Sequence, residues 1–403
     1  MPLGINAYGK KVPLLKKVLL FLAMFSGLTV SYGHAAQLPP TRQTNEQLNG
    51  LVREPLHLKI DLPNGQQAIL DAFVTRPALP GKLPVALLTH GTNGSDQSDR
   101  IQLNPNRFSS PAIAFARHGY AAVVVLRQGY GESTGTADDR GNSCKAPQHA
   151  RAGEMARNDI LAALNAIRQQ PWASDKKAVL VGMSSGGFSV LAASALNPSG
   201  VQAIINVDGG RGAKKDGSVC DQSGLFAAIR SYGQTARIPT LWVYAANDRS
   251  FSPALGRQMF DIYNQAGGKA EFYRTEAYHQ NGHAFLVSAP ERFWWQPIAQ
   301  FLRQNALPAA ETVILPKVSL PLPALSPAVR QAFEDYQAAQ TYEKAFATNG
   351  NAVWGSAIWA RTRQAAENQA LAVCQEQRRK NDAACVLYAS GNQMTVARPA
   401  AGT

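Results

Sequence analysis

The feature that most constrains the fold of this chain is the stretch VLVGMSSGG at positions 179–187. A short apolar run leads directly into Gly182-Met183-Ser184-Ser185-Gly186, and a helix-like stretch follows. Gly-x-Ser-x-Gly between a buried strand and a helix indicates a strained turn that exposes the serine hydroxyl above a sheet. The pattern predicts Ser184 as a nucleophile. A glycine- and serine-rich turn that serves packing only is the alternative.

The rest of the first three hundred residues supports such a sheet. From Leu56 to about Asn305, strand-like and helix-like stretches alternate. A hairpin is predicted around Asn64-Gly65. Short apolar, β-rich runs bounded by turn residues predict buried parallel strands. These segments are 56–61 and 68–77 for the hairpin, then 84–90, 120–126, 178–182, 203–208 and 240–245. Alternating β and α elements predict an α/β fold with a doubly wound, mostly parallel sheet.

A change in composition divides the chain. Five prolines between Leu307 and Pro327 predict an extended linker that makes few long-range contacts. The main domain is therefore predicted at 36–306, the Pro-rich linker at 307–327, and a second, smaller α+β C-terminal domain at 328–403. In that domain we expect helices at 328–340 and 361–379. Strands are expected near 342–348, 352–360 and 385–390, with a short last strand.

The N-terminus has the composition of a secretory signal peptide. Lys10, Lys11, Lys16 and Lys17 precede an apolar run from 18 to 30, and small residues follow as far as Ala36. We predict a signal peptide at 1–35, cleaved after Ala35 or Ala36. An uncleaved membrane anchor is the alternative, although the apolar run is short for a membrane span.

Export changes how the net charge is interpreted. The formal charge is +13, and the four lysines of the signal peptide account for +4, which leaves about +9 (13 − 4). The remaining basic residues are scattered and do not alternate with aromatic residues, so no nucleic-acid partner is expected. Attraction to acidic envelope polymers or anionic surfaces fits export better. A periplasmic or secreted bacterial protein is predicted, with no membrane span after signal removal.

The four cysteines also suit an oxidising compartment. An even number in an exported protein indicates two disulfides, and four cysteines allow three pairings. Cys374 and Cys385 are close in sequence, so we pair them, which leaves Cys144 with Cys220. No Cys-x-x-Cys spacing occurs, so no metal site is expected.

A serine hydroxyl needs a base, and the base needs an acid to orient it. In this architecture the order along the chain is Ser, acid, His. Asp248 follows the apolar run 240–245 and is the preferred acid, with Asp208 as its competitor. His283 lies at a loop-to-helix junction and is the preferred base, with His279 as the alternative.

An oxyanion hole would complete the site. One donor is predicted to be the backbone N–H of Ser185, the residue after the nucleophile. The other is predicted to be Thr92, in the His90-Gly91-Thr92-Asn93-Gly94 loop. The loop that begins Arg127-Gln128-Gly129-Tyr130-Gly131 does not have Gly-x-Gly-x-x-Gly spacing, so no dinucleotide site and no other cofactor are expected.

Taken together, residues 55 to 306 resemble the α/β-hydrolase superfamily, closest to the dienelactone hydrolase-like and prolyl-oligopeptidase-like serine hydrolases. The resemblance rests on LLTHGTNG, VVVLRQGYGESTG, LVGMSSGG, WVYAANDRSF and NGHAFL, in that order. Dienelactone hydrolases proper use a cysteine nucleophile, whereas this chain has Ser184, so a lactone substrate is not carried over. The C-terminal domain resembles small Trp-containing, Cys-paired modules of exported bacterial proteins, through VWGSAIWA and ALAVCQ…ACVLYAS.

The resemblance implies an exported serine hydrolase. We expect a carboxylic ester hydrolase that acts on a small-molecule ester through an acyl-enzyme. A serine peptidase of the same fold is the second hypothesis. The third is a non-catalytic envelope protein in which residues 328–403 bind a polymer or a protein partner.

Overall fold

The computed structural model describes residues 49–92, 97–137, 144, 146–316, 320, 326–350 and 353–395. The predicted signal peptide at 1–35 lies outside the described residues, as do parts of the predicted linker. Within these described ranges, no helix is both long enough and apolar enough to cross a membrane.

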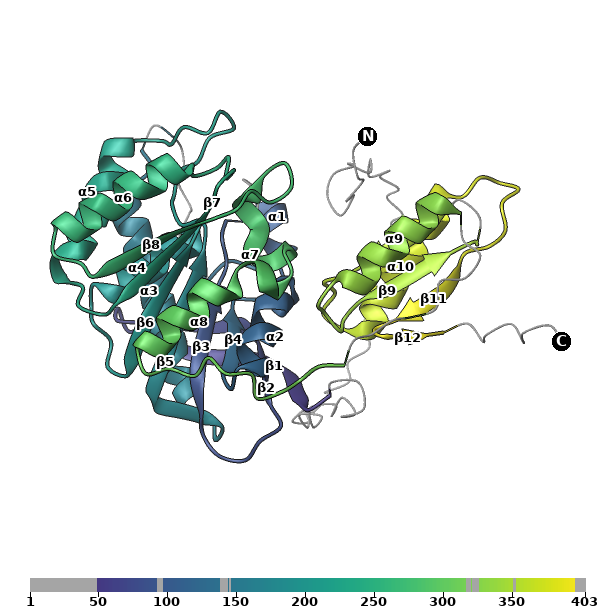
Figure 1. Ribbon diagram of the computed structural model, residues 1–403, viewed down its shortest axis with the longest axis horizontal. Helices are drawn as coiled ribbons and strands as arrows, with labels where there is room; N and C mark the ends of the chain where they lie inside the picture. Colours follow the sequence, from purple (N-terminus) through teal and green to yellow (C-terminus); the bar gives the residue numbers. More distant parts are fainter. Residues whose placement is uncertain are drawn as a thin grey trace, which may run out of the picture. The chain divides into compact units, whose positions relative to one another are not determined.

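The main sheet has eight strands in the order β1-β2-β4-β3-β5-β6-β7-β8 (Figure 1). The pairs β1·β2 and β2·β4 are antiparallel, and all later pairs are parallel. The predicted opening hairpin and the predicted parallel strands are therefore confirmed. The strands are β1 (Leu51–Asp61), β2 (Gln67–Pro77), β3 (Leu83–Thr89), β4 (Ala121–Val125), β5 (Ala173–Met183), β6 (Val201–Val207), β7 (Thr240–Ala245) and β8 (Ala270–Thr275).

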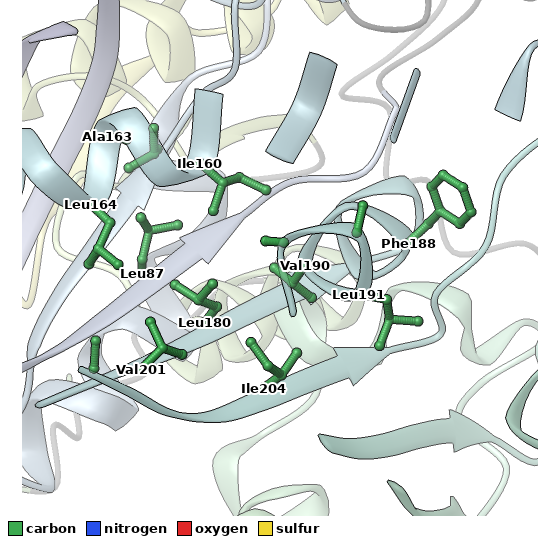
Figure 2. Packing of buried hydrophobic residues seen from close by; sticks show 14 of the residues in the cluster. Leu87, Ile160, Ala163, Leu164, Leu180, Phe188, Val190, Leu191, Val201 and Ile204 are labelled. Atoms are coloured by element: carbon green, nitrogen blue, oxygen red, sulfur yellow. The ribbon is translucent and has the colours of Figure 1, made fainter. Parts of the chain in front are cut away.

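Helices cover both faces of this sheet, because successive strand side chains point to opposite faces. In β3, Leu87 packs in one apolar cluster, whereas Ala86 and Leu88 pack in the other. Figure 2 shows the first cluster, where Leu87 and Leu180 of the sheet lie beneath helix side chains. That face carries α3 (His149–Arg168), α4 (Ser185–Ser194), α5 (Gln222–Thr235) and α6 (Pro253–Gln265). The opposite face carries α2 (Ser109–Arg117), α7 (Phe285–Ser288) and α8 (Trp295–Gln304). The predicted doubly wound α/β fold is confirmed.

The last helix of the main domain is preceded by a separate short turn. The structure has a short 3₁₀ turn, η4 (Glu291–Phe293), followed by α8. Between them Trp294 leaves helical geometry, with φ of −129°, and its side chain is fully buried. The break therefore falls at a residue that apolar periodicity alone does not distinguish from its neighbours.

A second, four-stranded antiparallel sheet follows in the order β10-β9-β11-β12. Two helices pack against it. Gly355 lets the backbone of the longer helix approach the sheet, since a Cβ there would lie 2.2 Å from Ala370 O. The small C-terminal α+β domain is therefore confirmed, although its strands are shorter than predicted. Its elements are α9 (Pro327–Ala338), β9 (Ala345–Thr348), β10 (Trp354–Ala357), α10 (Arg363–Gln377), β11 (Val386–Ser390) and β12 (Gln393–Met394).

Residues 307–316 do not behave as the contact-poor linker that the prolines predicted. The N–H groups of Thr312 and Val313 both donate to Arg117 O at the end of α2, at 2.7 and 3.1 Å. The hydroxyl of Tyr120 donates to Pro308 O at 2.7 Å. Leu307 is buried in the second apolar cluster. Prolines remove backbone donors, but their neighbours still bond and pack here, so this segment is part of the main domain's surface layer.

Candidate active site

Ser184 stands on a strained turn between β5 and α4. Its φ of 57° and ψ of −124° lie in a region that L-residues rarely adopt. The flanking glycines make this possible. A Cβ on Gly182 would lie 2.1 Å from Gly186 O, and one on Gly186 would lie 2.5 Å from His90 O. The turn that the Gly-x-Ser-x-Gly pattern predicted is therefore present, with the backbone packing that excludes larger residues.

Ser184, His283 and Asp248 form a hydrogen-bonded chain. Ser184 Oγ lies 3.0 Å from His283 Nε2, and His283 Nδ1 lies 2.9 Å from Asp248 Oδ2. The Asp248 side chain is fully buried, and its Oδ1 accepts the N–H groups of Ser250 at 2.6 Å and Phe251 at 3.0 Å. Parallel strands bring these residues together, because Asp248 follows β7 and His283 lies in η3 (Gly282–Ala284) after β8.

The two competing residues take different places. His279 has φ of 46° and packs its ring edge-on against Tyr278, while its carbonyl accepts from Asn247 Nδ2 at 2.9 Å. The hydrogen bond to Ser184 belongs to His283. Asp208 follows β6 and is fully buried beside Asp248. Burial, and next the charge of Asp248, raise the pKa of the Asp208 carboxyl well above its usual range.

The predicted oxyanion residues adjoin the serine. Ser185 opens α4, and the first N–H groups of a helix have no intrahelical acceptor. On the other side, a Cβ on Gly91 would lie 2.7 Å from Ser184 Cβ, so the Gly91-Thr92 segment runs directly past Ser184. The Thr92 hydroxyl donates to Ser185 Oγ at 3.1 Å. The helix N-terminus also contributes a partial positive charge here.

His90 fixes the segment beside Ser184. Its Nε2 accepts the backbone N–H of Arg127 at 3.0 Å, so its Nδ1 carries the proton and donates to Gly91 O at 2.6 Å. Burial, and next the Arg127 charge, lower the pKa of His90 well below its usual range. The imidazole is therefore neutral, and its two hydrogen bonds connect the Gly91 segment to the backbone of Arg127.

The buried side chain of Arg127 also takes part in the hydrogen-bond network around His90. Its Nη1 donates to His90 O at 2.7 Å and to Thr89 Oγ1 at 2.9 Å, and its Nη2 lies 3.4 Å from Ser185 Oγ. Its side chain is fully buried. The guanidinium thus lies against the segment that carries Thr89 and His90 and near Ser185.

Two asparagines that the sequence analysis did not single out join the acid loop to the histidine loop. Asn247 Nδ2 donates to His279 O, and Asn247 Oδ1 accepts the N–H of Tyr278 at 2.9 Å. Asn281 Oδ1 accepts from Arg249 N at 3.1 Å and from His283 N at 3.2 Å. These contacts set the spacing of His283 from Asp248. The one signal available was position, since Asn247 precedes Asp248 and Asn281 lies two residues before His283.

Both predicted disulfides are present, Cys144–Cys220 and Cys374–Cys385. Cys220 belongs to the loop after β6, and Gly210 of that loop donates to Ser184 O at 3.1 Å. The first disulfide therefore lies in the loop after β6, which also contacts Ser184.

Asp208, Asp248 and His283 each offer one possible ligand atom within 4.8 Å of the others. Both ring nitrogens of His283 already take part in the serine–aspartate chain. The hydrogen-bonded chain accounts for this grouping without invoking an ion.

The fold and the site define the class of protein. An eight-stranded, mostly parallel sheet that presents a serine on a strand-turn-helix elbow is the architecture of an α/β-hydrolase. The sequence model for the X-Pro dipeptidyl-peptidase (S15) family matches residues 65–307, more than half of the chain. The chain therefore belongs to this family, and it is a serine hydrolase of the α/β-hydrolase fold. The superfamily resemblance seen in the sequence is confirmed.

Solved structures give weaker likenesses. A Mycobacterium tuberculosis puromycin-hydrolyzing peptidase is 18% identical with a TM-score of 0.41, and the match covers 62% of this chain and 40% of that one. A putative dienelactone hydrolase from Klebsiella pneumoniae is 17% identical with a TM-score of 0.42, covering 64% and 99%. An acetyl xylan esterase from Paenibacillus sp. R4 is 17% identical with a TM-score of 0.46, covering 66% and 90%. The chain thus spans about 40% of the length of the first of these. No curated protein matches the sequence.

Proposed function

We propose that the protein hydrolyses acyl compounds through a covalent intermediate on Ser184, with His283 as the base and Asp248 as the orienting acid. The observation that carries the proposal is the chain Ser184 Oγ···His283 Nε2···Asp248, with distances of 3.0 and 2.9 Å. Nucleophile, base and orienting group within hydrogen-bonding distance are what a serine needs to attack a carbonyl carbon at neutral pH.

The reaction proceeds in two half-reactions. Ser184 Oγ attacks the acyl carbon while His283 Nε2 takes its proton, and the carbonyl oxygen becomes an oxyanion. The N–H groups of Ser185 and Thr92 are the proposed donors to that oxyanion. The imidazolium, stabilised by Asp248, then protonates the leaving group as the tetrahedral intermediate collapses. A water molecule, activated by the same histidine, repeats the attack and releases the acid and free Ser184.

A carboxylic ester is the proposed substrate. The loop after β6 carries the exposed Lys214 and Lys215 together with the exposed Asp216 and Asp221, so these four charges offset one another. The exposed Arg249 directly follows Asp248, and a positive charge there favours a neutral or anionic acyl group over a substrate that presents an ammonium group. Asp208 and Asp248 are buried, and Asp248 is already bonded to His283.

The family match favours a second candidate, the release of X-Pro dipeptides from a peptide N-terminus. The same triad would serve, since His283 can protonate an amine leaving group as well as an alcohol. The two candidate functions differ in how the substrate is bound. A dipeptidyl peptidase has to bind the free ammonium of its substrate, which calls for a carboxylate facing the cleft.

The two candidates are separated by substrate. We expect p-nitrophenyl acetate or butyrate to be cleaved with a higher kcat/KM than Ala-Pro-p-nitroanilide, and N-acetylation of the anilide not to abolish its slow cleavage. Rapid cleavage of the free anilide and none of the acetylated one would favour the peptidase. A fluorophosphonate should label the wild type but not Ser184→Ala. Ser189→Ala, in α4 below the elbow, is a matched control that should still be labelled.

We infer that the protein acts outside the cytoplasm, as a periplasmic or secreted enzyme. Support comes from the two disulfides, which form and persist in oxidising compartments. N-terminal sequencing of protein recovered from the cell envelope should begin at residue 36 or 37, and a full-length N-terminus in the cytoplasm would contradict export. Pull-down of envelope polymers or proteins by the full chain tests the proposed binding role of residues 328–403.

A further inference from the structure

Asp208 is a buried carboxyl group that the mechanism above does not use. Its backbone N–H donates to Val243 O at 2.8 Å, and its Oδ1 accepts the N–H of Ala245 at 2.9 Å. Its φ of 45° turns the chain sharply at the end of β6. These bonds fix the carboxyl between the ends of β6 and β7, with no exposure to solvent.

This carboxyl lies next to the acid of the triad. One atom each of Asp208, Asp248 and His283 lie within 4.8 Å of one another. Two carboxylates this close in a buried site cannot both be ionised, because neither charge is solvated and the two repel. One of the pair therefore holds a proton.

The hydrogen bonds decide which carboxyl keeps its charge. Asp248 accepts from His283 Nδ1 and from the N–H groups of Ser250 and Phe251, and three donors stabilise a carboxylate. Asp208 accepts one hydrogen bond from a backbone N–H, at its Oδ1. Among the described residues, no N–H or O–H group donates a hydrogen bond to its Oδ2. A proton on Asp208 Oδ2 would make that oxygen a donor, with the Asp248 carboxylate as its acceptor.

The other groups around Asp208 do not compete for this proton. Tyr244 of β7 donates its hydroxyl to Gly209 O, and burial raises the pKa of that phenol. Asn206 of β6 is neutral. His283 is thus the neighbouring group whose charge changes in the reaction, and Asp248 is the neighbouring carboxylate that stays charged. Burial and the neighbouring Asp248 charge raise the pKa of Asp208, in agreement with the geometry.

We propose that Asp208 is a protonated positioning residue, which donates to Asp248 in the resting site and becomes the carboxylate partner of His283 when Asp248 loses its charge. The proposal rests on the proposed function of the Ser184 site. The fold explains it, since β6 and β7 are neighbouring parallel strands and an aspartate after either one reaches the same histidine.

Substitution of Asp248 tests the second part of the proposal. Loss of the orienting acid costs on the order of 10⁴ in kcat when nothing replaces it. In Asp248→Asn the repulsion from the Asp248 charge is gone but the burial of Asp208 remains, so Asp208 ionises beside the imidazole only as pH rises. We expect Asp248→Asn to lose only about 10²–10³ in kcat with p-nitrophenyl acetate, with activity that increases as pH rises. The double variant Asp208→Asn/Asp248→Asn should lose at least about tenfold more and lack that pH dependence.

A control removes a different, partly buried carboxylate. Glu291 forms an ion pair with Arg117, away from the site. The double variant Glu291→Gln/Asp248→Asn should therefore have the same activity as Asp248→Asn alone. Equal rates and equal pH profiles for Asp248→Asn and Asp208→Asn/Asp248→Asn would overturn the proposal. So would a loss in Asp208→Asn alone as large as that in Asp248→Asn, because it would mean that Asp208 carries the charge.

A spectroscopic measurement covers the case in which a double variant does not fold. The infrared difference spectrum of wild type minus Asp208→Asn should contain the C=O stretch of a protonated carboxylic acid at neutral pH. Its absence would overturn the resting-state assignment. This readout needs no turnover, so it is distinct from a failure of the proposed function, which would appear as undiminished esterase activity in Ser184→Ala.

Discussion

Arg53 and Glu343 form a buried ion pair across 290 residues of sequence. Arg53 Nη2 lies 2.6 Å from Glu343 Oε2, and Arg53 Nε lies 3.2 Å from Oε1, so the contact is bidentate. The two side chains are 0% and 1% exposed. Arg53 belongs to β1 of the main sheet, whereas Glu343 lies in the C-terminal α+β domain. This buried ion pair connects the main domain to the C-terminal domain.

Removal of one partner of this pair should be strongly destabilising. In Glu343→Ala, the guanidinium of Arg53 stays buried without a carboxylate, which costs about 3–5 kcal/mol. Glu343→Gln keeps the shape and an acceptor oxygen, so we expect a smaller loss. Urea unfolding at pH 7 measures both free energies.

An exposed ion pair provides the matched control. Arg257 and Asp261 bond at 3.0 Å on the surface of α6, where both side chains are well exposed. Asp261→Ala should change the free energy of unfolding by no more than about 0.5 kcal/mol. Equal effects of Asp261→Ala and Glu343→Ala would mean that the buried pair contributes nothing beyond a surface contact.

A chain cut after Ala310 should not fold as an intact main domain. The few long-range contacts predicted for the proline-rich linker would instead have allowed the main domain to fold without residues 328–403. Truncation removes Glu343 from Arg53, and it removes Arg361, whose Nη2 lies 2.6 Å from Oδ2 of the buried Asp71. Truncation also removes Tyr342, which packs with Leu51 and Ile113, so the main domain would lose two ion pairs and the apolar cover beside them.

The yield of soluble protein and the thermal melting temperature, compared with those of the full chain, measure the effect. A truncated chain with an unchanged melting temperature and unchanged kcat would show that the C-terminal contacts are dispensable. A control cut after Thr395 leaves both ion pairs in place and should behave as the full chain does.

These contacts mark the limit of what the sequence predicts. Buried strands were predicted because each is a local apolar run, and Ser184 because its glycines lie within two residues of it. The bond between Arg53 and Glu343 has no such local pattern, since either residue alone resembles any surface charge. The same holds for Asn247 and Asn281, whose role depends on which loops the sheet brings side by side. Periodicity identifies elements, whereas polar contacts between distant elements depend on the completed fold.

We expect the strained backbone of Ser184 to lower the free energy of unfolding, although hydrolysis requires this residue. Ser184 has φ of 57°, which glycine adopts without the steric cost that a Cβ imposes. We therefore expect Ser184→Gly to raise the free energy of unfolding by about 1 kcal/mol while abolishing hydrolysis. Ser189→Gly, inside α4, should lower it by a similar amount, because glycine is unfavourable within a helix. Chemical denaturation of the two variants compares them directly. A destabilised Ser184→Gly would show that the elbow carries no relievable strain.

Stability should fall in mildly acidic solution because several histidines are buried in the neutral form. Burial is the largest cause that lowers the pKa of His90, His118 and His149. At His118 it outweighs the opposing Ala114 carbonyl and Glu291 carboxylate. As pH falls through about 6.5, the unfolded chain binds a proton at each position and the folded protein does not. Each histidine thus contributes a loss of at most about 1.4 kcal/mol per pH unit until its own folded-state pKa is reached. Asp208 acts in the opposite direction, because its raised pKa gives stability at low pH that is lost as pH rises.

The variant His118→Gln allows the contribution of one buried histidine to the pH dependence of stability to be measured by itself. Its ring stacks on Trp295 at 4.1 Å, and its Nδ1 lies 2.8 Å from Ala114 O, in a part of the protein away from Ser184. In a comparison of His118→Gln with wild type, the contribution of Asp208 cancels because both proteins keep it. At pH 8 the difference in unfolding free energy gives the cost of the lost packing alone. Between pH 7 and 5 that difference should shrink, because only the wild type loses the stability of a neutral buried imidazole. Urea unfolding at half-unit steps of pH measures it, and a difference that stays constant or widens toward pH 5 would show that His118 is charged in the folded protein.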